Sequence, residues 1–443
     1  MGLTGLEIFK QLPKTNCKDC GYPTCLAFAM ALANGKATLD SCPHVSDAAK
    51  ENLDSASAPP IKLVKVGSGE KVLELGDETE LFRHDKKFYH PTAVAILVSD
   101  QEDVEAKVNQ VKELDFERVG LEFITDMVAV KNDSGDAEKF KAAVEKTAAL
   151  TDKVMVLIAE DADVMAGALE AAAEKKPLIY AATADNYEAM TALAKEKGCP
   201  LAVKGKGLED TAALVEKVVA LGYKELVLDT GERQTSRVLA DLTQIRRLAV
   251  KKRFRPLGYP TISFTSKEDP LEEAAQAAVY LSKYAGIVVM KTAKKQHILP
   301  LLSWRQNLFT DPQKPIQVEA KLYEVGDVNE NSPLYITTNF SLTYYIVEGE
   351  VETSKVPSYI IAVNTDGVSV LTAWAAGKLT GDSIAEAMKK AGVEEKLAHK
   401  KVVIPGHVAV LSGAVEESTG GWEVLVGPRE ASGIPKYAKE NFA

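Results

Sequence analysis

Short runs of apolar, mostly β-branched residues alternate with amphipathic stretches through the middle of the chain. The eight runs are Ala93–Val98, Leu121–Val130, Val154–Ile158, Leu178–Ala182, Leu201–Val203, Leu226–Leu228, Thr261–Phe264 and Ile287–Met290. The stretches between them have helical spacing, and many open with Asp, a preferred N-cap: Asp136–Leu150, Asp161–Lys175, Asp185–Lys197, Asp210–Leu221 and, without Asp, His297–Phe309. Buried strands that alternate with helices pair in parallel through right-handed crossovers. The pattern therefore predicts a (β/α)8 TIM barrel, which we assign to residues 59–320.

In such a barrel, chemistry is located at the carboxyl ends of the strands. The polar residues predicted there are Ser99, Asp100, Asn132, Glu160, Thr183, Lys204, Asp229, Arg233, Thr265, Ser266, Lys291 and Thr292. No two of them form a motif with a known mechanism, so we expect them to cap helices and satisfy loop backbone groups. The basic run from Arg246 to Arg255 is likewise expected to form a solvated helix face with a basic end, not a phosphate site.

From about Tyr323 the alternation resumes and predicts an open, Rossmann-like α/β sheet in residues 321–443. The predicted strands are Leu334–Thr338, Ser358–Asn364, Lys401–Ile404 and Trp422–Val426, and the predicted helices are Ser341–Glu352, Thr372–Leu379, Asp382–Ala391 and His407–Glu417. Ligands of open sheets bind outside the carboxyl ends of the strands. Four loops there, 337–343, 364–373, 405–407 and 427–435, contain or adjoin mixtures of Gly or Pro with Thr, Ser or Asn, which predicts a binding crevice. The loops lack G-x-G-x-x-G, which disfavours a dinucleotide. We expect His407 to be a helix-start donor and not a metal ligand.

Four of the five cysteines lie near the N-terminus, with the spacing C-x2-C-x4-C-x16-C at Cys17, Cys20, Cys25 and Cys42. Gly21 and Pro23 supply turns between them, and Cys25 is predicted to open a helix that runs to Asn34. Four thiolates suit a structural zinc or a [4Fe–4S] cluster, and the spacing alone does not decide between them. Four unligated cysteines are a third interpretation. The residues favour iron–sulfur over zinc, and the Pro-rich stretch after residue 53 indicates a linker that ends this unit near residue 58.

Composition narrows the class of protein. Of the 443 residues, 46% are hydrophobic and 26% charged, and the net charge of -10 argues against a nucleic-acid surface. The sequence contains no apolar stretch of ~18 residues, so we expect no membrane span. The N-terminus also lacks a signal-peptide pattern, so we expect a cytoplasmic protein. Cys199 is solitary and is expected to be a small buried hydrophobe.

The sequence resembles the large (gamma) subunit of the corrinoid iron–sulfur protein of the reductive acetyl-CoA (Wood–Ljungdahl) pathway, and the resemblance covers the whole chain. It rests on the N-terminal phrase from Cys17 to Cys25 with the distal Cys42, on the barrel, and on four C-terminal phrases. Those phrases are TTNFSLTYY, VNTDGVSVLTAWAAGK, IPGHVAVLSGAVEE and GWEVLVGPREASGIP.

The resemblance implies two cofactors. A [4Fe–4S] cluster would be held by Cys17, Cys20, Cys25 and Cys42, and a cobamide by the C-terminal domain. The implied cobamide contacts are Phe340, Ile346, the segment Val370, Leu371, Thr372 and Ala373, and Gly433, with Thr338, Asn339, Thr343 and Gly406 as neighbours. None of the six histidines sits two residues after an Asp, so the Asp-x-His-x-x-Gly signature is absent and the cobamide would be bound base-off without a protein His on cobalt.

The resemblance also implies a function as a methyl carrier, a component of a methyltransferase system. Co(I) would take the methyl group of methyltetrahydrofolate, presented by a separate methyltransferase. Methyl-Co(III) would then donate it to CO dehydrogenase/acetyl-CoA synthase. The cluster, fed by a low-potential electron donor, would return Co(II) to Co(I), and a small corrinoid iron–sulfur protein subunit would complete a heterodimer. No residue of the chain would itself be catalytic. The alternative is a stand-alone Fe–S electron-transfer protein whose C-terminal domain binds a flavin or another cofactor.

Overall fold

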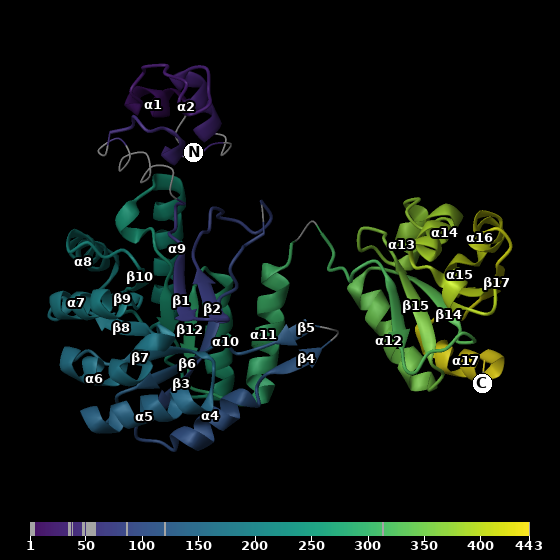
Figure 1. Cartoon of the computed structure of the whole chain (residues 1–443). Coiled ribbons are helices and arrows are strands. Elements are labelled where there is room, and N and C mark those ends of the chain that lie inside the picture. The colour runs from purple at the N-terminus through teal and green to yellow at the C-terminus, as the bar shows by residue number, and fades with distance from the viewer. Residues whose placement is uncertain are drawn as a thin grey trace. The chain divides into compact units, whose positions relative to one another are not determined.

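The computed structural model describes residues 5–33, 37, 39–46, 49, 59–85, 87–118, 121–311 and 314–442. The chain divides into two compact units. Residues 1–115 and 124–309 form the first, and residues 116–123 and 310–443 form the second. The division into domains at residues 58 and 320 stays a prediction, and residues 54–58 of the predicted linker (54–60) lie outside the described residues. Figure 1 shows the elements of each unit.

In the N-terminal part of the first unit, the described residues include the short helices α1 (Gly5–Gln11) and α2 (Cys25–Ala33) and a 3₁₀ turn at Leu39–Ser41. Helix α2 begins at Cys25, as predicted, while Asn34 and Gly35, its predicted end, lie outside the described residues. Ile8, Leu12 and Phe28 form a small core together with Cys25 and Cys42. Two of the four clustered thiols are thus part of the packing of this region.

The barrel prediction is confirmed. Its eight parallel strands are β3 (Ala93–Ser99), β6 (Met127–Lys131), β7 (Val154–Ile158), β8 (Leu178–Ala182), β9 (Leu201–Lys204), β10 (Leu226–Asp229), β11 (Ile262–Phe264) and β12 (Ile287–Met290). They are hydrogen-bonded in the order β10-β9-β8-β7-β6-β3-β12-β11, and a parallel bridge between Leu228 and Thr261 closes the ring between β10 and β11. Every strand is almost wholly buried, because core side chains fill one face and helices cover the other.

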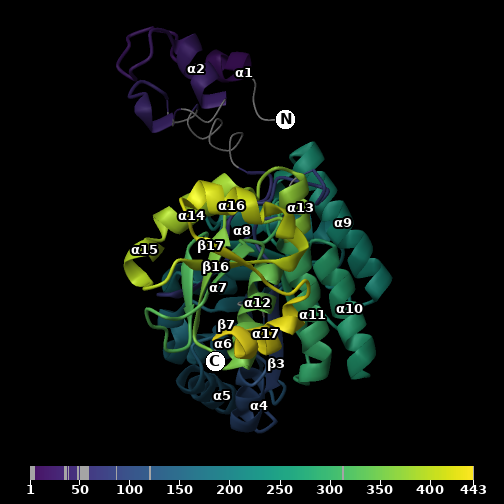
Figure 2. The same ribbon diagram turned by 90° about the vertical axis from the view of Figure 1, so that its right-hand side faces the viewer.

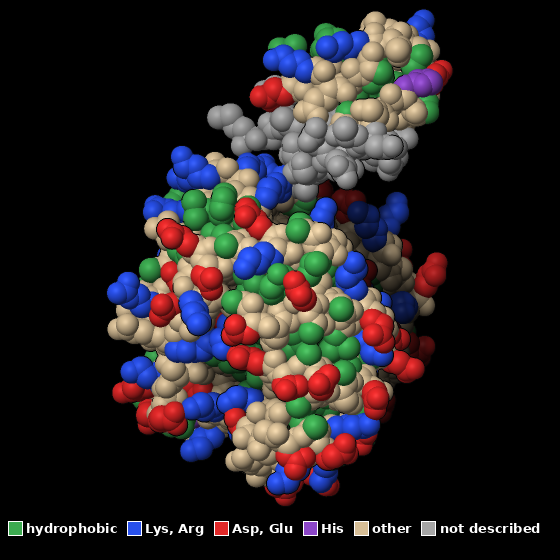
Figure 3. All heavy atoms as spheres, turned by 90° about the vertical axis from the view of Figure 1, so that its left-hand side faces the viewer, with side chains coloured by type: hydrophobic (Ala, Val, Ile, Leu, Met, Phe, Trp, Pro, Cys, Tyr) green, Lys and Arg blue, Asp and Glu red, His purple; other side chains and the backbone are tan. Residues whose placement is uncertain are grey.

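The helices around the barrel follow the strands in the chain. They are α4 (Val104–Lys112), α5 (Ala137–Leu150), α6 (Ala162–Ala172), α7 (Tyr187–Lys197), α8 (Leu208–Ala220), α9 (Thr235–Lys252), α10 (Pro270–Ser282) and α11 (Lys295–Phe309). Asp136 and Asp161 cap α5 and α6 as predicted, each accepting two backbone N–H groups. On the barrel face in Figure 3, acidic and basic side chains are interspersed. A hairpin of β1 (Val64–Ser68) and β2 (Lys71–Leu75) adds Val64 and Val66 to the barrel core.

Three sequence-based expectations for the barrel region are wrong. Asp185 and Asp210 do not cap α7 and α8, whose N-cap residues are Asn186 and Gly207. The run Leu121–Val130 is not one strand. Its start forms β5 (Leu121–Phe123), which pairs with β4 (Phe116–Arg118) in a hairpin, and only its end is the barrel strand β6. Arg246 is not part of a solvated face: it is 4% exposed and bonds Glu78. Its guanidinium also lies 5.3 Å from the ring centroid of Phe88 and 4.9 Å from that of Tyr284.

The second unit contains a five-stranded sheet in the order β13-β15-β14-β16-β17, with bounds β13 (Leu322–Val325), β14 (Leu334–Thr338), β15 (Ser358–Val363), β16 (Lys401–Ile404) and β17 (Glu423–Val426). The last four are parallel, as the predicted open α/β sheet requires, and β13 is an added antiparallel edge. Its helices are α12 (Ser341–Ser354), α13 (Val370–Ala375), α14 (Gly381–Lys390), α15 (Val393–Lys396), α16 (Ser412–Thr419) and α17 (Ile434–Phe442). Residues of α12 and α17 share one core with the sheet, and residues of α13 to α16 share another, so both faces are covered (Figure 2).

No helix in the described ranges combines the length and the apolar character that crossing a bilayer would need.

Candidate functional sites

A cavity lies at the carboxyl ends of the parallel strands of the second unit, where the sequence predicts a crevice. Its volume is about 260 Å³. It is lined by Tyr335, Ile336, Thr337, Thr343, Ile346, Val347, Ser369, Val370, Leu371, Val403, Ile404, Pro405, His407, Gly427, Pro428, Arg429, Glu430, Ala431 and Ile434. The lining comes from β14, β16, α12, α13 and the loop after β17. The prediction that loops of this sheet edge come together is confirmed by this lining.

Four of the predicted cofactor residues line the cavity: Thr343, Ile346, Val370 and Leu371. Ile346 is 48% exposed and Leu371 is 46% exposed. Leu342 on α12 and Trp374 on α13 are also large apolar side chains that stay exposed. Large apolar side chains gathered on two helices beside a cavity are typical of a surface that a ligand or a partner covers.

Asn339 does not line the cavity but organises one of its loops. The side chain is buried, and its Oδ1 accepts hydrogen bonds from Thr365 N at 2.9 Å, Thr365 Oγ1 at 3.1 Å and Gly367 N at 3.1 Å. Its Nδ2 donates to Gln317 Oε1 at 3.1 Å. These bonds fix the turn at Gly367, where φ is 72°, and this turn leads into Val370 and Leu371. Asn339 is therefore a positioning residue.

The two predicted glycines also act through packing. A Cβ on Gly406 would lie 2.5 Å from Gly427 O and 2.8 Å from the Pro428 carbonyl carbon, so the loops after β16 and β17 meet only because no side chain stands there. A Cβ on Gly433 would meet Pro428 Cβ at 2.8 Å. Among the other predicted contacts, Ala373 is buried in the core, Thr372 is exposed, and Phe340 precedes α12 as its N-cap residue.

Three buried hydroxyl groups of β14 lack a hydrogen-bond partner within the described part of the chain: Tyr335 Oη, Thr337 Oγ1 and Thr338 Oγ1. Burial raises the pKa of Tyr335 above its ordinary value, so its hydroxyl stays a neutral donor. Tyr335 and Thr337 line the cavity. The sequence does not single them out, because they are marked by buried hydroxyls without a hydrogen-bond partner, which only the structure shows. Buried hydroxyls are costly unless they are bonded, so the hydroxyls of Tyr335 and Thr337 are available to a polar ligand in the cavity.

The structure brings three of the four N-terminal cysteines into one apolar cluster. Cys25 and Cys42 are buried in it, and Cys20 packs against it. Cys17 is exposed, and its Sγ lies within 4.8 Å of a carboxylate oxygen of Asp19 and of a ring nitrogen of His44. His44 Nε2 is 2.7 Å from Asp19 Oδ2, and hydrogen bonds from His44 and from Cys17 lower the pKa of Asp19.

A turn with Lys18 at φ 71° and Gly21 at φ 79° carries the chain from Cys17 towards Cys25. Free thiols on such a tight loop, mostly enclosed by apolar groups, suit a soft metal centre. His407 is not part of this thiol region. It lines the cavity of the second unit, and its Nε2 lies 3.4 Å from Glu430 Oε1.

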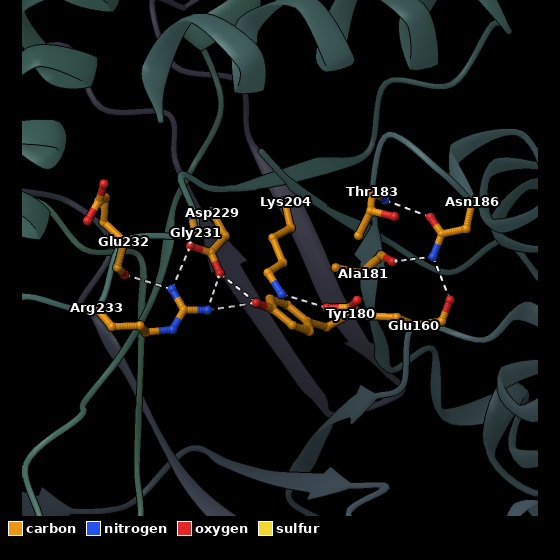
Figure 4. A network of polar contacts seen from close by, with 10 residues as sticks. All are labelled: Glu160, Tyr180, Ala181, Thr183, Asn186, Lys204, Asp229, Gly231, Glu232 and Arg233. Carbon is orange, nitrogen blue, oxygen red and sulfur yellow. Dashed lines mark hydrogen bonds and ion pairs between the residues drawn. The ribbon is translucent and has the colours of Figure 1, made fainter. Parts of the chain in front are cut away.

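The mouth of the barrel holds a closed polar network (Figure 4). Tyr180 Oη donates to Asp229 Oδ2 at 2.6 Å, and Arg233 bonds both oxygens of Asp229 at 2.8 and 3.0 Å. Nearby, Lys204 Nζ is 2.6 Å from Glu160 Oε1. Burial raises the pKa of Tyr180 well above its ordinary value. Asp229 Oδ1 also accepts a hydrogen bond from Gly231 N at 2.8 Å, so Asp229 satisfies a loop backbone group, as expected.

The fold and the two sites define a class of protein: a barrel protein with a cysteine-rich N-terminal region and a C-terminal α/β sheet that has a cavity at the carboxyl ends of its parallel strands. A family model described as the CO dehydrogenase/acetyl-CoA synthase delta subunit matches residues 63–438, and a model of an Fe–S cluster domain matches residues 12–44. The chain belongs to the family that contains the corrinoid/iron–sulfur protein large subunit and the acetyl-CoA decarbonylase/synthase gamma subunit.

Two relatives define this membership. The chain is 60% identical to the "Corrinoid/iron-sulfur protein large subunit" of Moorella thermoacetica, over 100% of both chains. It is 38% identical to the "Acetyl-CoA decarbonylase/synthase complex subunit gamma" of Methanothermobacter thermautotrophicus, over 99% of this chain and 98% of that one. Among solved structures, a Yersinia pestis dihydropteroate synthase aligns with 49% of this chain and 95% of its own at 14% identity, with a TM-score of 0.35.

Proposed function

We propose that the chain is a corrinoid-dependent methyl carrier, the large subunit of a two-cofactor methyl-transfer protein. The observation that carries the proposal is the full-length similarity to a corrinoid/iron–sulfur protein large subunit. The cavity of the second unit and the cluster of N-terminal thiols support it. When bound, the corrinoid would supply a cobalt that takes a methyl group from methyltetrahydrofolate and yields it to acetyl-CoA synthase, and a [4Fe–4S] cluster would supply an electron to restore the cobalt.

The residues of the second unit fit a corrinoid. The cavity of about 260 Å³ is smaller than the ~300–1,000 Å³ of a typical drug-sized ligand site, so it can enclose only part of so large a cofactor. Ile346, Val370 and Leu371 would bind its apolar parts, and Tyr335 and Thr337 would donate to its polar atoms. Thr343 completes the lining, while Asn339, Gly406 and Gly433 hold the loops in place. Thr338, Phe340, Thr372 and Ala373 are proposed as neighbours of the cofactor on the same elements.

The thiols of Cys17, Cys20, Cys25 and Cys42 would hold the cluster. Apolar packing around Cys25 and Cys42 would keep water from its sulfurs, which favours a low potential. Thiols kept free for a cluster need a reducing compartment, so we place the protein in the cytoplasm.

Exposed apolar side chains beside the cavity support a protein partner there. Leu342 and Trp374 are 51% and 41% exposed on the helices that also carry Ile346 and Leu371. A small corrinoid iron–sulfur protein subunit would cover them in a heterodimer. The other partners would be the methyltetrahydrofolate:corrinoid methyltransferase, CO dehydrogenase/acetyl-CoA synthase and a low-potential electron donor.

The test separates methyl transfer from reactivation by comparing two variants of the purified heterodimer. Cys20→Ala should retain the corrinoid and accept a methyl group after chemical reduction, yet fail to recover from oxidation with a protein electron donor. Ile346→Glu should lose the corrinoid and keep the iron. Recovery of Cys20→Ala at the unmodified rate, or methyl uptake by a protein without cobalt, would contradict the proposal.

A further inference from the structure

A short segment ahead of β13 pairs with the loop that carries Asn339. We call this segment, residues 316–318, the strap. Its central residue, Gln317, forms an antiparallel bridge with Phe340, the N-cap residue of α12. Beside the bridge, Val318 N donates a hydrogen bond to Asn339 O at 2.9 Å. Backbone bonds therefore hold the strap against the loop that follows β14, next to the proposed corrinoid site.

The neighbours of the Asn339 side chain permit only one orientation of its amide. Its Oδ1 faces Thr365 N at 2.9 Å and Gly367 N at 3.1 Å, and backbone N–H groups can only donate. The Nδ2 group must therefore face acceptors on its other side, where Gln317 Oε1 lies at 3.1 Å and Asn364 Oδ1 at 3.4 Å. Because Asn339 is only 2% exposed, its donors depend on protein acceptors. Gln317 supplies the shorter of these two bonds.

Gly367 makes room for the Gln317 side chain. A Cβ on Gly367 would lie 2.5 Å from Gln317 Cγ, so the Gln317 side chain lies across the turn at Gly367. This turn leads to Val370 and Leu371, which line the cavity. One exposed residue outside the helices and strands thus contacts both the side chain that fixes the turn and the turn itself.

We propose that Gln317 is a positioning residue for the corrinoid: it fixes the amide of Asn339 and, through that amide, the turn that places Val370 and Leu371. The role at the corrinoid rests on the proposed function. A loop that is ordered before its ligand arrives spares the binding step the cost of ordering it, and most such gains in affinity appear as slower release. The strap should therefore slow the release of the corrinoid.

Two substitutions of Gln317 separate its hydrogen bond from the presence of the strap itself. Gln317→Ala removes the acceptor for Asn339 Nδ2 and the side chain that crosses Gly367. Gln317→Glu keeps an acceptor on a side chain of the same length and should behave like the unmodified protein. Lys314→Ala, a change of an exposed residue just before the strap, is the matched control. Because Gln317 is itself exposed, none of these changes removes a core side chain.

The measurements are hydrogen–deuterium exchange of a peptide spanning residues 364–371 and the rate at which the purified heterodimer releases cobalt on dialysis. Gln317→Ala should raise both rates roughly two- to tenfold, the range that corresponds to the loss of one hydrogen bond. Gln317→Glu and Lys314→Ala should leave both rates unchanged. Because Gln317 acts through Asn339, adding Gln317→Ala to Asn339→Ala should raise neither rate further.

Unchanged rates in Gln317→Ala, additive effects in the double variant, or a Gln317→Glu protein that behaves like Gln317→Ala would overturn the proposal. Faster exchange without faster release of cobalt would also overturn it, because Gln317 would then serve the fold alone. Absence of cobalt from the unmodified heterodimer would contradict the proposed function instead. The exchange rates would still report the contact between Gln317 and Asn339, so the two failures are distinguishable.

Discussion

Asn339 fixes the backbone of Thr365: its amide oxygen accepts the Thr365 N–H at 2.9 Å, and the Thr365 hydroxyl lies 3.1 Å from the same oxygen and 3.0 Å from Val368 O. The two residues lie in the loops after β14 and β15, so this contact joins two loops of the proposed corrinoid site. Replacing Asn339 by Ala would leave buried donors unsatisfied, which costs about 1–3 kcal/mol for each such group.

We therefore expect Asn339→Ala to lower both the stability of the protein and its retention of corrinoid. Denaturant unfolding and cobalt content after gel filtration measure the two effects. Asn441→Ala removes an exposed amide whose Nδ2 donates to Tyr437 O, and it should change neither. Full cobalt retention by Asn339→Ala would contradict the positioning role of this residue.

Gly406 should not tolerate a side chain. Because a Cβ there would lie 2.5 Å from Gly427 O, Gly406→Ala must push the loops after β16 and β17 apart, at an expected cost of ~1–3 kcal/mol and with weaker corrinoid binding. Gly413→Ala is a matched control, since its Cβ would meet nothing within 4 Å in helix α16. That control should be neutral or stabilising by about 0.5–1 kcal/mol. Equal unfolding midpoints for the two variants would count against the close approach of these loops.

The stability of the barrel should depend on the buried ion pair of Arg246 and Glu78. Glu78 Oε1 also accepts Tyr89 N at 2.7 Å and His90 N at 3.0 Å, while its Oε2 is 3.1 Å from Arg246 Nη2. Glu78→Gln should destabilise the barrel by about 3–5 kcal/mol, because it leaves a buried guanidinium uncompensated. Glu386→Gln, which breaks an exposed and solvent-screened pair with Lys390, should change the stability far less in the same thermal unfolding experiment. A comparable loss in both would show that the Arg246 site is not desolvated.

Cys199 should be the slowest thiol of the folded protein to react. Burial raises its pKa from 9.0 to about 11, so its thiolate fraction below pH 9 is about 100-fold lower than that of an ordinary thiol. Its neutral thiol stabilises the fold fully below pH 9, and this contribution is lost as the pH rises towards 11. Alkylation at pH 8.5, read by mass spectrometry of peptides, should modify the exposed Cys17 of the metal-free protein first. Rapid labelling of Cys199 without denaturant would refute this.

The barrel could be predicted from the sequence because its strands are buried on both faces and therefore appear as short apolar runs. Seven of the eight runs match a barrel strand to within one or two residues, as Val154–Ile158 does. The prediction of one strand over Leu121–Val130 was wrong for a physical reason. Phe116 and Phe123 stack across a hairpin with their ring centroids 4.8 Å apart, and a local apolar pattern does not distinguish such a hairpin strand from the start of a longer strand. The burial of Arg246 was not predictable, since its partners Glu78, Phe88 and Tyr284 are distant in the chain.

The proposed corrinoid site was only partly predictable for the same reason. The loops after the parallel strands could be identified, because parallel strands end at one edge. Which residues line the cavity depends on packing: Thr343 and Ile346 lie on it, while Asn339 and Gly406 act behind it. Tyr335 and Thr337 became candidates only when the structure showed their hydroxyls buried without a partner.

The central claim is that this chain carries a corrinoid and an iron–sulfur cluster together. Metal analysis of the purified heterodimer, combined with an electron paramagnetic resonance spectrum of the reduced protein, tests it most directly. The account predicts about four irons and about one cobalt per large subunit, with signals of a reduced [4Fe–4S] cluster and of base-off Co(II) at intermediate potential. Zinc in place of iron, or a flavin with no cobalt, would contradict it.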